Sequence, residues 1–309
     1  MLLWYIEYIM KCLKCKIVID VAPIYGLHEE CFIASFGLQN SAKFQDLDPK
    51  KSSSKQSGAE IKKKVDTFFQ GVYLKYSAKL GQVSYILKIQ EPEYPDLPAI
   101  EYLCNQIAEL LGMDIPPYHL INFNGRITFV TRNFMQDYIG ALQHIYKYLP
   151  IGEENHNCEE IVKAILNNTG KLADVAKFID ICLFDSLIGN NDRHGRNLGI
   201  IETADLKKLS PVYDNPSFIG IQDDFLLDSD TNPSGCIWTK VSKNPKPQDY
   251  IEEFARLGHE TISEKFRKKI ITQSSNIINL VNDSDLPAKR KNAFIRLIEK
   301  RMRDFRNDK

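Results

Sequence analysis

The sequence predicts an α+β fold with a β-rich N-terminal lobe, residues 1–137, and a helical C-terminal lobe, residues 138–309. Two observations predict it. Alternating apolar and polar residues, separated by turn signals, fill much of the region 72–134, which is typical of β-hairpins. After about residue 137 the apolar residues recur instead at helical spacing. A chain of 309 residues is long enough for two such lobes.

The N-terminal lobe begins with a small unit containing cysteine and histidine, residues 10–37, and continues into a polar stretch, residues 40–66. The small unit ends in an amphipathic turn that stops at Gly37. The polar stretch is rich in Lys and Ser and has few apolar side chains. Because so few apolar contacts cannot offset the entropy lost on ordering, we expect a linker or mobile loop there.

Two hairpins and one helix follow in the N-terminal lobe. The first turn falls at Gly81, and the second falls at Asn124 and Gly125, a pair strongly favoured in two-residue turns. The expected strands are 72–80 and 83–89 in the first hairpin, and 118–123 and 127–134 in the second. Between the hairpins, residues 98–112 have helical spacing and end at Gly112, which is typical of a helix C-terminus.

The C-terminal lobe combines helices with two short strand-like segments. A helix passes through the apolar residues from Leu172 to Leu187 and breaks at Gly189. Short apolar segments at 198–201 and 212–213 are expected to be strands. Amphipathic helices are expected at about 249–257, 263–281 and 287–305.

Composition excludes several classes of protein. The 40 Lys and Arg residues balance the 40 Asp and Glu residues, so no overall positive field attracts nucleic acid. Residues 1–10 are apolar but contain Glu7 and are too short to span a bilayer, so we expect them to pack on the body. The 7 cysteines are odd in number and scattered, which indicates reduced thiols and a cytoplasmic location.

The segment after the predicted 172–187 helix carries the most informative pattern. Asp192 and Asn197 have four residues between them, and Asp214 follows a short apolar segment. In protein kinases with this spacing, the Asp accepts the proton of the attacking hydroxyl and the Asn binds Mg²⁺. A second Asp completes the metal ligands. The alternative is that all three side chains only form turn hydrogen bonds. Their order along the chain favours phosphoryl transfer.

A resemblance to a known family rests on the same residues. Asn190-x-Asp192-x-His194-x-x-Asn197, followed by Tyr213-Asp214, resembles the HipA family of bacterial toxin kinases. The stretches FVTRNF at 129–134 and GCIWTKVSKNPKPQDYIEEFARL at 235–257 are similar to that family too. The resemblance implies a bilobal fold like that of protein kinases and phosphatidylinositol 3/4-kinases, a serine/threonine kinase activity, and ATP and Mg²⁺ as cofactors.

The resemblance also implies roles for individual residues. Asp192 matches the catalytic base, and Asn197 and Asp214 match the Mg²⁺ ligands. Lys88 matches the lysine that contacts the ATP phosphates, and Glu101 is in position to hold that lysine. His194 matches a histidine of the catalytic loop, where three interpretations stay open: it orients Asp192, touches phosphate, or is a buried structural residue. Thr131, Arg132 and Phe134 match the segment that binds adenine, which their backbone groups are expected to recognise.

One departure from the family concerns the glycine-rich loop, in which serines are autophosphorylated. The aligned segment 68–75 keeps Gly71 as a phosphate-binding residue and lacks those serines. Either phosphate binding is altered, or the loop is longer and begins upstream at Ser52, Ser53 and Ser54. This triplet is a candidate autophosphorylation site, and the alternative is a plain polar linker.

A second constellation consists of Cys12, Cys15, His28 and Cys31. Two close pairs of soft ligands match the spacing of a structural Cys₃His zinc site. A similar loop that folds without metal is the alternative.

The resemblance to the short HipT-type toxins of three-component HipBST systems implies partners. The expected substrate is a protein, an aminoacyl-tRNA synthetase in the family precedent, and the expected partners are a small antitoxin and a DNA-binding antitoxin. Direct nucleic-acid binding and membrane binding are not expected. A lipid kinase is the alternative enzyme, which the acidic residues Asp223, Asp224, Asp228 and Asp230 disfavour near an anionic bilayer. A pseudokinase that only binds partners is the alternative outside enzymes.

Overall fold

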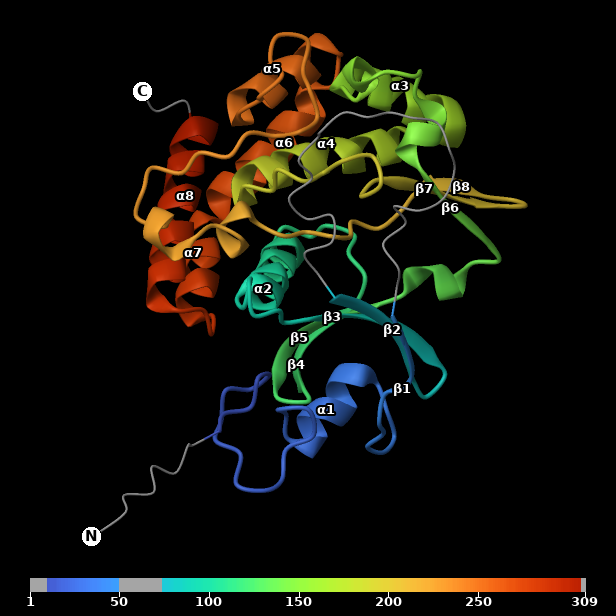
Figure 1. The fold of residues 1–309 in the computed structure, drawn as a ribbon. Coiled ribbons are helices and arrows are strands. Elements are labelled where there is room, and N and C mark those ends of the chain that lie inside the picture. The colour runs from blue at the N-terminus through green and yellow to red at the C-terminus, as the bar shows by residue number, and fades with distance from the viewer. Residues whose placement is uncertain (1–9, 50–73, 307–309) are drawn as a thin grey trace. The chain divides into compact units, whose positions relative to one another are not determined.

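The computed structural model describes residues 10–49 and 74–306, and its fold is α+β, as the sequence predicts (Figure 1). The chain divides into two compact units. Among the described residues, the first unit contains 10–49, 74–99 and 117–133, and the second contains 100–116 and 134–306.

A five-stranded antiparallel sheet forms the centre of the described part of the first unit, in the order β1-β2-β3-β5-β4. Both predicted hairpins are confirmed: Gly81, Asn124 and Gly125 have positive φ angles of 60°, 52° and 81°. Such angles match the right-handed twist of the flanking strands. The strands are β1 (Gln45–Pro49), β2 (Leu74–Leu80), β3 (Val83–Ile89), β4 (Tyr118–Phe123) and β5 (Arg126–Arg132).

The core of the first unit joins this sheet to helix α1 (Glu29–Phe36). Phe36 on α1 packs against Phe32, Phe44 and Tyr85, and the Tyr25 ring stacks on Phe123 at 5.8 Å between centroids. Aromatic pairs at such distances add to the free energy gained by burial. The small N-terminal unit is therefore part of the core rather than an appendage.

Strand β1 corrects one prediction. Residues 40–66 were expected to form a linker, yet Gln45–Pro49 pairs with β2. An edge strand gains its stability from backbone hydrogen bonds and does not need an apolar face, so composition alone does not reveal it. Residues 50–66 of that stretch lie outside the described residues.

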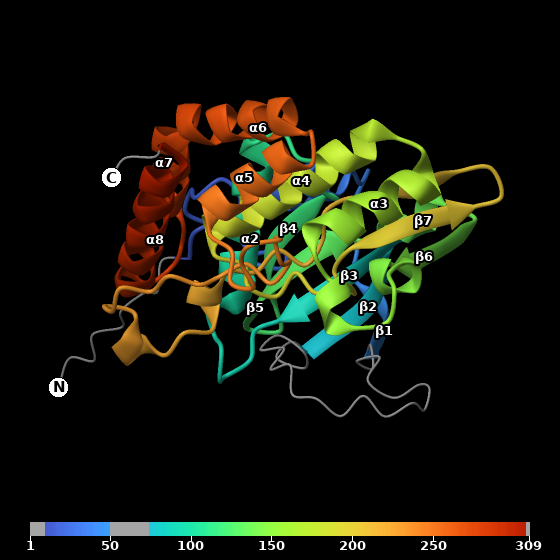
Figure 2. The same cartoon turned by 90° about the horizontal axis from the view of Figure 1, so that it is seen from above.

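Helix α4 is the centre of the second unit, where it packs against α3, α5, α6 and α8 (Figure 2). It is buried on almost every side, which explains why its apolar residues exceed one stripe. The helices are α2 (Leu97–Leu110), which begins in the first unit, α3 (Cys158–Thr169), α4 (Leu172–Ile188), α5 (Pro247–Arg256), α6 (Glu260–Thr272), α7 (Ser274–Asp283) and α8 (Ala288–Arg306). Short 3₁₀ turns are η1 (Phe134–Asp137), η2 (Ile145–Tyr148), η3 (Glu153–Asn155), η4 (Phe218–Gly220) and η5 (Asp224–Leu226).

A small antiparallel sheet lies beside α3 in the order β6 (Gly140–His144), β7 (Gly199–Thr203) and β8 (Lys207–Leu209). The segment 198–201 is a strand as predicted, whereas the strand expected at 212–213 is wrong. The chain already reverses after β7, because Thr203 Oγ1 accepts the N–H groups of Asp205 and Leu206. The Val212 N–H bonds to the Asp114 carbonyl instead of a strand.

The helix expected at 263–281 is two helices, α6 and α7, which meet at Gln273. Gln273 leaves the helical conformation, with φ −87° and ψ 3°, but α7 begins at the next residue, so the sequence shows no gap between the two apolar patterns. Neither β6 nor α3 was among the elements expected from the sequence.

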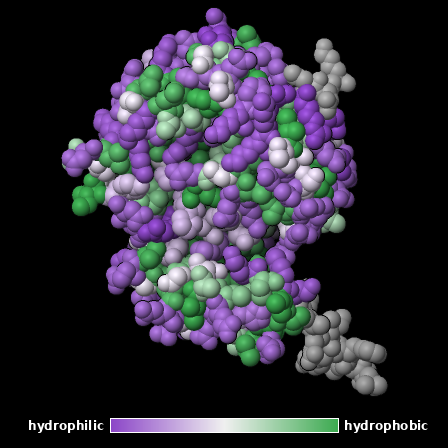
Figure 3. All heavy atoms as spheres, turned by 180° about the vertical axis from the view of Figure 1, so that it is seen from behind, coloured by the Kyte–Doolittle hydropathy of each residue, from purple (hydrophilic) through white to green (hydrophobic). Residues whose placement is uncertain are grey.

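Within the described residues, none of the helices is long and apolar enough to cross a membrane. Figure 3 shows a surface on which hydrophobic residues are scattered among hydrophilic ones.

Candidate active site

Asp192, His194 and Asn197, three of the residues predicted to carry the chemistry, lie in a loop that begins where α4 ends. Gly189 ends the helix with a positive φ of 68°. A Cβ atom at this position would lie 2.7 Å from Leu297 Cδ2 and 2.9 Å from Pro233 Cγ. The backbone angle and the close packing therefore both require glycine.

We expect Gly189→Ala to lower the free energy of unfolding by about 2–6 kcal/mol, because the left-handed angle and the overpacking each cost roughly 1–3 kcal/mol. Gly170→Ala is a matched control. Gly170 also ends a helix with a positive φ, 66°, but its Cβ position has no neighbour within 4 Å. Urea denaturation of both variants measures the difference. Equal losses would contradict the packing argument.

Arg193 is the structural centre of the loop. Its side chain is 1% exposed, and its Nε and Nη2 donate to the two carboxylate oxygens of Asp185 at 2.7 and 2.9 Å. The same guanidinium donates to the carbonyl oxygens of Asn197 at 3.1 Å and Tyr213 at 2.6 Å. A further bond reaches Asn215 Oδ1 at 2.7 Å. One buried cation thus ties α4, the loop and the segment around Asp214 together.

Asp192 and Asn197 are both held in this loop. Asp192 is 6% exposed, and its backbone N–H donates to Asn190 Oδ1 at 3.0 Å. Its carbonyl oxygen accepts from Asn197 Nδ2 at 2.9 Å, which is one of the turn hydrogen bonds that the alternative interpretation predicts. These bonds fix the backbone of Asp192 and do not involve its carboxylate. With Nδ2 committed, Oδ1 is the atom of Asn197 that can bind a cation.

Asp214 has a strained backbone, with a positive φ of 52°. A non-glycine residue in this region costs roughly 1–3 kcal/mol and persists only where its surroundings hold it. Both neighbours do so: Tyr213 and Asn215 accept hydrogen bonds from Arg193, and the Tyr213 hydroxyl donates to the Arg196 carbonyl at 2.8 Å. The strain is therefore held next to the loop that contains Asp192 and Asn197, which favours a functional role.

His194 lies near Asp192 and within electrostatic reach of Asp214. Burial lowers its pKa to about 4, although the Asp214 carboxylate opposes this, so the ring is neutral at pH 7. Its Nδ1 accepts the Arg196 N–H at 3.1 Å, which leaves the proton on Nε2. Nε2 lies 3.9 Å from Asp192 Oδ2. At this separation the two atoms are beyond hydrogen-bond distance, so the ring lies beside the Asp192 carboxylate and the three interpretations of His194 stay open.

The predicted ATP-phosphate lysine lies in the first unit. Lys88 on β3 is 2% exposed, and its Nζ lies 5.6 Å from the ring centroid of Phe129, its cross-strand partner on β5. This burial excludes the ordinary solvated lysine of an alternating strand. Thr131 and Arg132 lie further along β5, opposite Ile86 and Tyr85 on β3.

Glu101 and Phe134 lie in the second unit. Glu101 on α2 is 1% exposed, and its carbonyl accepts from Asn105 Nδ2 at 2.8 Å. Asn105 Oδ1 accepts in turn from Asn215 Nδ2 at 3.2 Å, so α2 is tied to the segment around Asp214. The Phe134 ring lies 5.7 Å from the Tyr213 ring. The predicted roles of Lys88 and Glu101 toward each other remain a prediction.

Several other predicted site residues are placed as follows. Cys12, Cys15, His28 and Cys31 come together in the first unit. Gly71 and the triplet Ser52, Ser53 and Ser54 lie outside the described residues.

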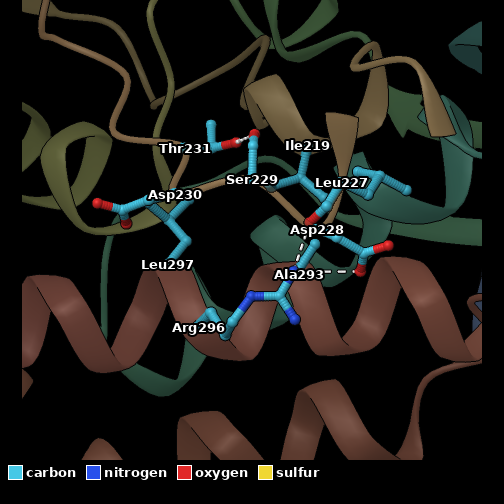
Figure 4. A pocket seen from close by; sticks show the side chains of 9 residues that line it. All are labelled: Ile219, Leu227, Asp228, Ser229, Asp230, Thr231, Ala293, Arg296 and Leu297. Atoms are coloured by element: carbon cyan, nitrogen blue, oxygen red, sulfur yellow. Dashed lines mark hydrogen bonds and ion pairs between the residues drawn. The ribbon is translucent and has the colours of Figure 1, made fainter. Parts of the chain in front are cut away.

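A pocket in the second unit lies between α8 and the segment 219–231 (Figure 4). Arg296 donates to the Leu227 carbonyl and lies 3.8 Å from Asp228. Three of the four acidic residues of this segment pair with α8: Asp224 with Arg290, Asp228 with Lys289 and Arg296, and Asp230 with Lys300. Their charges are thus largely balanced by α8. The acidic residues of this segment therefore disfavour an anionic bilayer less than their number in the sequence suggests.

Asp185, Arg193 and the residues that support the loop from outside had no role predicted from the sequence. His156 Nε2 lies 3.2 Å from the Arg193 carbonyl oxygen, and the Tyr146 ring fills the space at Gly195. Asp185 did leave a signal, because it is the charged residue in the last two turns of α4, where residues 181–188 are otherwise apolar or serine and all are buried. A buried charge of this kind requires a partner.

Comparisons with known proteins agree with the family resemblance found in the sequence. The HipA-like C-terminal domain matches residues 54–283. Two proteins of Sinorhizobium fredii, named "Putative kinase Y4mE" and "Putative kinase Y4dM", are each 26% identical over 161 and 149 residues. These matches cover 46% and 42% of this chain but only 38% and 36% of the relatives, so the chain spans little more than a third of their length.

Two solved structures share the fold. The Helicobacter pylori proinflammatory kinase CtkA superposes with a TM-score of 0.60 at 16% identity, covering 74% of this chain and 89% of that one. HipA of Shewanella oneidensis MR-1, solved with HipB and its operator DNA, superposes with a TM-score of 0.54 at 14% identity, covering 72% and 58%.

Proposed function

Because the chain belongs to the HipA-like C-terminal domain family, we propose that it is a kinase that transfers the γ-phosphoryl group of ATP to serine or threonine in a protein. The observation that carries the proposal is the loop in which Arg193 holds Asn197 and the segment around Asp214 beside Asp192. Phosphoryl transfer asks little covalent chemistry of a protein and depends on positioning and charge, which this loop supplies.

Each residue has a proposed role. The Asp192 carboxylate accepts the proton of the attacking hydroxyl, and neutral His194 orients it. The Asn197 amide oxygen and the Asp214 carboxylate are hard oxygen donors and suit Mg²⁺, which supplies charge neutralisation at the phosphates when bound. Contacts to ATP are proposed for Lys88 at the phosphates, supported by Glu101, for the Gly71 loop, and for the backbone at Thr131, Arg132 and Phe134 around adenine.

The family resemblance supports a toxin-type role beyond the chemistry. HipA of Shewanella oneidensis was solved with HipB and operator DNA, and we propose a small antitoxin and a DNA-binding antitoxin as partners of this chain. The proposed substrate is an aminoacyl-tRNA synthetase, in the cytoplasm of a bacterium. Autophosphorylation on Ser52, Ser53 or Ser54 is proposed as well, since each phosphate there would lie among Lys50, Lys51 and Lys55.

The test is incubation of the purified chain with γ-labelled ATP and Mg²⁺ in three reactions: alone, with a bacterial lysate, and with phosphatidylinositol vesicles. We expect label on a lysate protein and on this chain, with peptide mass spectrometry placing the latter on Ser52, Ser53 or Ser54. Label on lipid alone would replace the protein-kinase proposal with a lipid kinase. No transfer in any reaction would leave the pseudokinase alternative.

A further inference from the structure

The small unit at the N-terminus brings four metal-binding side chains to one point. Cys12 and Cys15 lie in a tight turn, in which the Lys16 N–H bonds to the Cys12 carbonyl and the Cys12 N–H to the Ile17 carbonyl, both at 2.9 Å. Lys16 has a positive φ of 64°, which lets the chain reverse directly behind the two thiols. The turn brings the two Sγ atoms within 4.8 Å of each other.

The second pair sits at the start of helix α1. His28 is the residue before the helix, and Cys31 lies one turn later, where the Phe32 N–H bonds back to the His28 carbonyl at 2.9 Å. Residues three apart on a helix share a face. The two pairs, from separate segments, therefore form one cluster of four.

The distances fit one ion. The ligand atoms of Cys12, Cys15, His28 and Cys31 all lie within 4.8 Å of one another. His28 Nδ1 lies 3.4 Å from Cys15 Sγ and 4.0 Å from Cys31 Sγ. Tetrahedral zinc with Zn–S near 2.3 Å and Zn–N near 2.0–2.1 Å places its ligand atoms about 3.5–3.8 Å apart. Three thiols and one imidazole are also the soft donor set that favours Zn²⁺.

The other nitrogen of His28 supplies an independent argument. Nε2 lies 3.1 Å from the Val18 carbonyl oxygen, an acceptor, so Nε2 carries the proton. The lone pair is therefore on Nδ1, the nitrogen that faces the thiols. Metal-ligating histidines almost always donate their second nitrogen to a carbonyl or carboxylate in this way.

We propose that Cys12, Cys15, His28 and Cys31 bind a structural Zn²⁺ that joins the 12–15 turn to α1. The surroundings explain the need: Ile17, Val18 and Val21, between the two ligand pairs, are 66%, 46% and 64% exposed, so residues 17–21 bury few apolar side chains. The chain that follows them bonds to the edge strand β4, where the Asn122 N–H donates to the Tyr25 carbonyl at 2.7 Å. The ion would thus hold the small N-terminal unit against the β4 edge of the sheet that contains Lys88.

The first test uses the unaltered full chain, purified without chelator from zinc-supplemented medium. Elemental analysis should find about one zinc per chain, as expected for one closed Cys₃His site. After exchange, Co²⁺ should give the visible bands of tetrahedral cobalt and the thiolate-to-cobalt bands in the near ultraviolet. A chain without zinc and without these cobalt bands would overturn the proposal, because thiol–imidazole hydrogen bonds would then account for the cluster.

Variants test the ligands. Cys15→Ser and His28→Gln should lose zinc on dialysis against a chelator that leaves it on the unaltered chain, and should lower the Tm. Cys236→Ser is the matched control, since Cys236 lies in the second unit, and it should keep its zinc. Zinc retained by both ligand variants, or lost equally by the control, would overturn the assignment. If a variant fails to fold, the cobalt spectrum of the unaltered chain still decides.

Discussion

Asp192→Asn should lower kcat for phosphoryl transfer by about 10²–10⁴-fold, the usual contribution of a general base. The amide has the shape of the carboxylate but cannot accept the hydroxyl proton. The hydrogen bonds of the Asp192 backbone to Asn190 and Asn197 do not depend on the side chain, so the loop should keep its form. ATP affinity should consequently change little.

The measurement combines single-turnover kinetics with labelled ATP, nucleotide binding by calorimetry, and thermal unfolding. Asp205→Asn is the matched control, because Asp205 is an exposed aspartate in the same unit, in the β7–β8 turn. It should keep full kcat. An Asp192→Asn protein with unchanged kcat would show that another group accepts the proton, and one with a lowered Tm would show that the residue acts through the fold.

Much of the site could be predicted because its signals are local in sequence. The spacing from Asp192 to Asn197 is a property of one loop, and Gly189 marks where the helix before it ends. The hairpins were predictable for the same reason, since Gly81 and Asn124-Gly125 determine their turns whatever lies around them. Local backbone chemistry therefore carries most of what the sequence reveals.

The features that were missed depend on residues far apart. β6 has only five residues, and its partner β7 lies more than fifty positions away, so no local pattern distinguishes it from a loop. β1 is an edge strand with polar side chains and depends on β2 for its hydrogen bonds. Asp214 could be predicted as a ligand, but its strained backbone could not, since Arg193 and Asn215 hold it through contacts that no spacing reveals.

Arg193→Met should lower the free energy of unfolding by about 3–5 kcal/mol, the usual result of removing one member of a buried ion pair. Methionine fills a similar volume but leaves the carboxylate of Asp185 buried without its cation. Asp185 is 5% exposed, so water cannot replace the lost partner. Urea denaturation measures the loss. Lys163→Met is the control, because Lys163 makes only ion pairs with Glu159 and Glu160 on the protein surface and should leave the midpoint unchanged.

A double-mutant cycle separates the ion pair from simple loss of packing. Asp185→Leu together with Arg193→Met removes both charges. The double variant should therefore lose less free energy of unfolding than the two single variants added together, by about 0.5–3 kcal/mol. Additive losses would show that the two side chains do not stabilise the fold as a pair.

Arg193→Lys distinguishes the charge from the geometry. Lysine keeps the positive charge next to Asp185 but lacks the planar guanidinium that reaches the Asn197 carbonyl, the Tyr213 carbonyl and Asn215 together. Folding should therefore be retained better than in Arg193→Met, while kcat falls because the segment around Asp214 is no longer held beside the loop. A lysine variant with full kcat would mean that charge alone positions the site. The planar guanidinium of Arg193 would then have no part in catalysis.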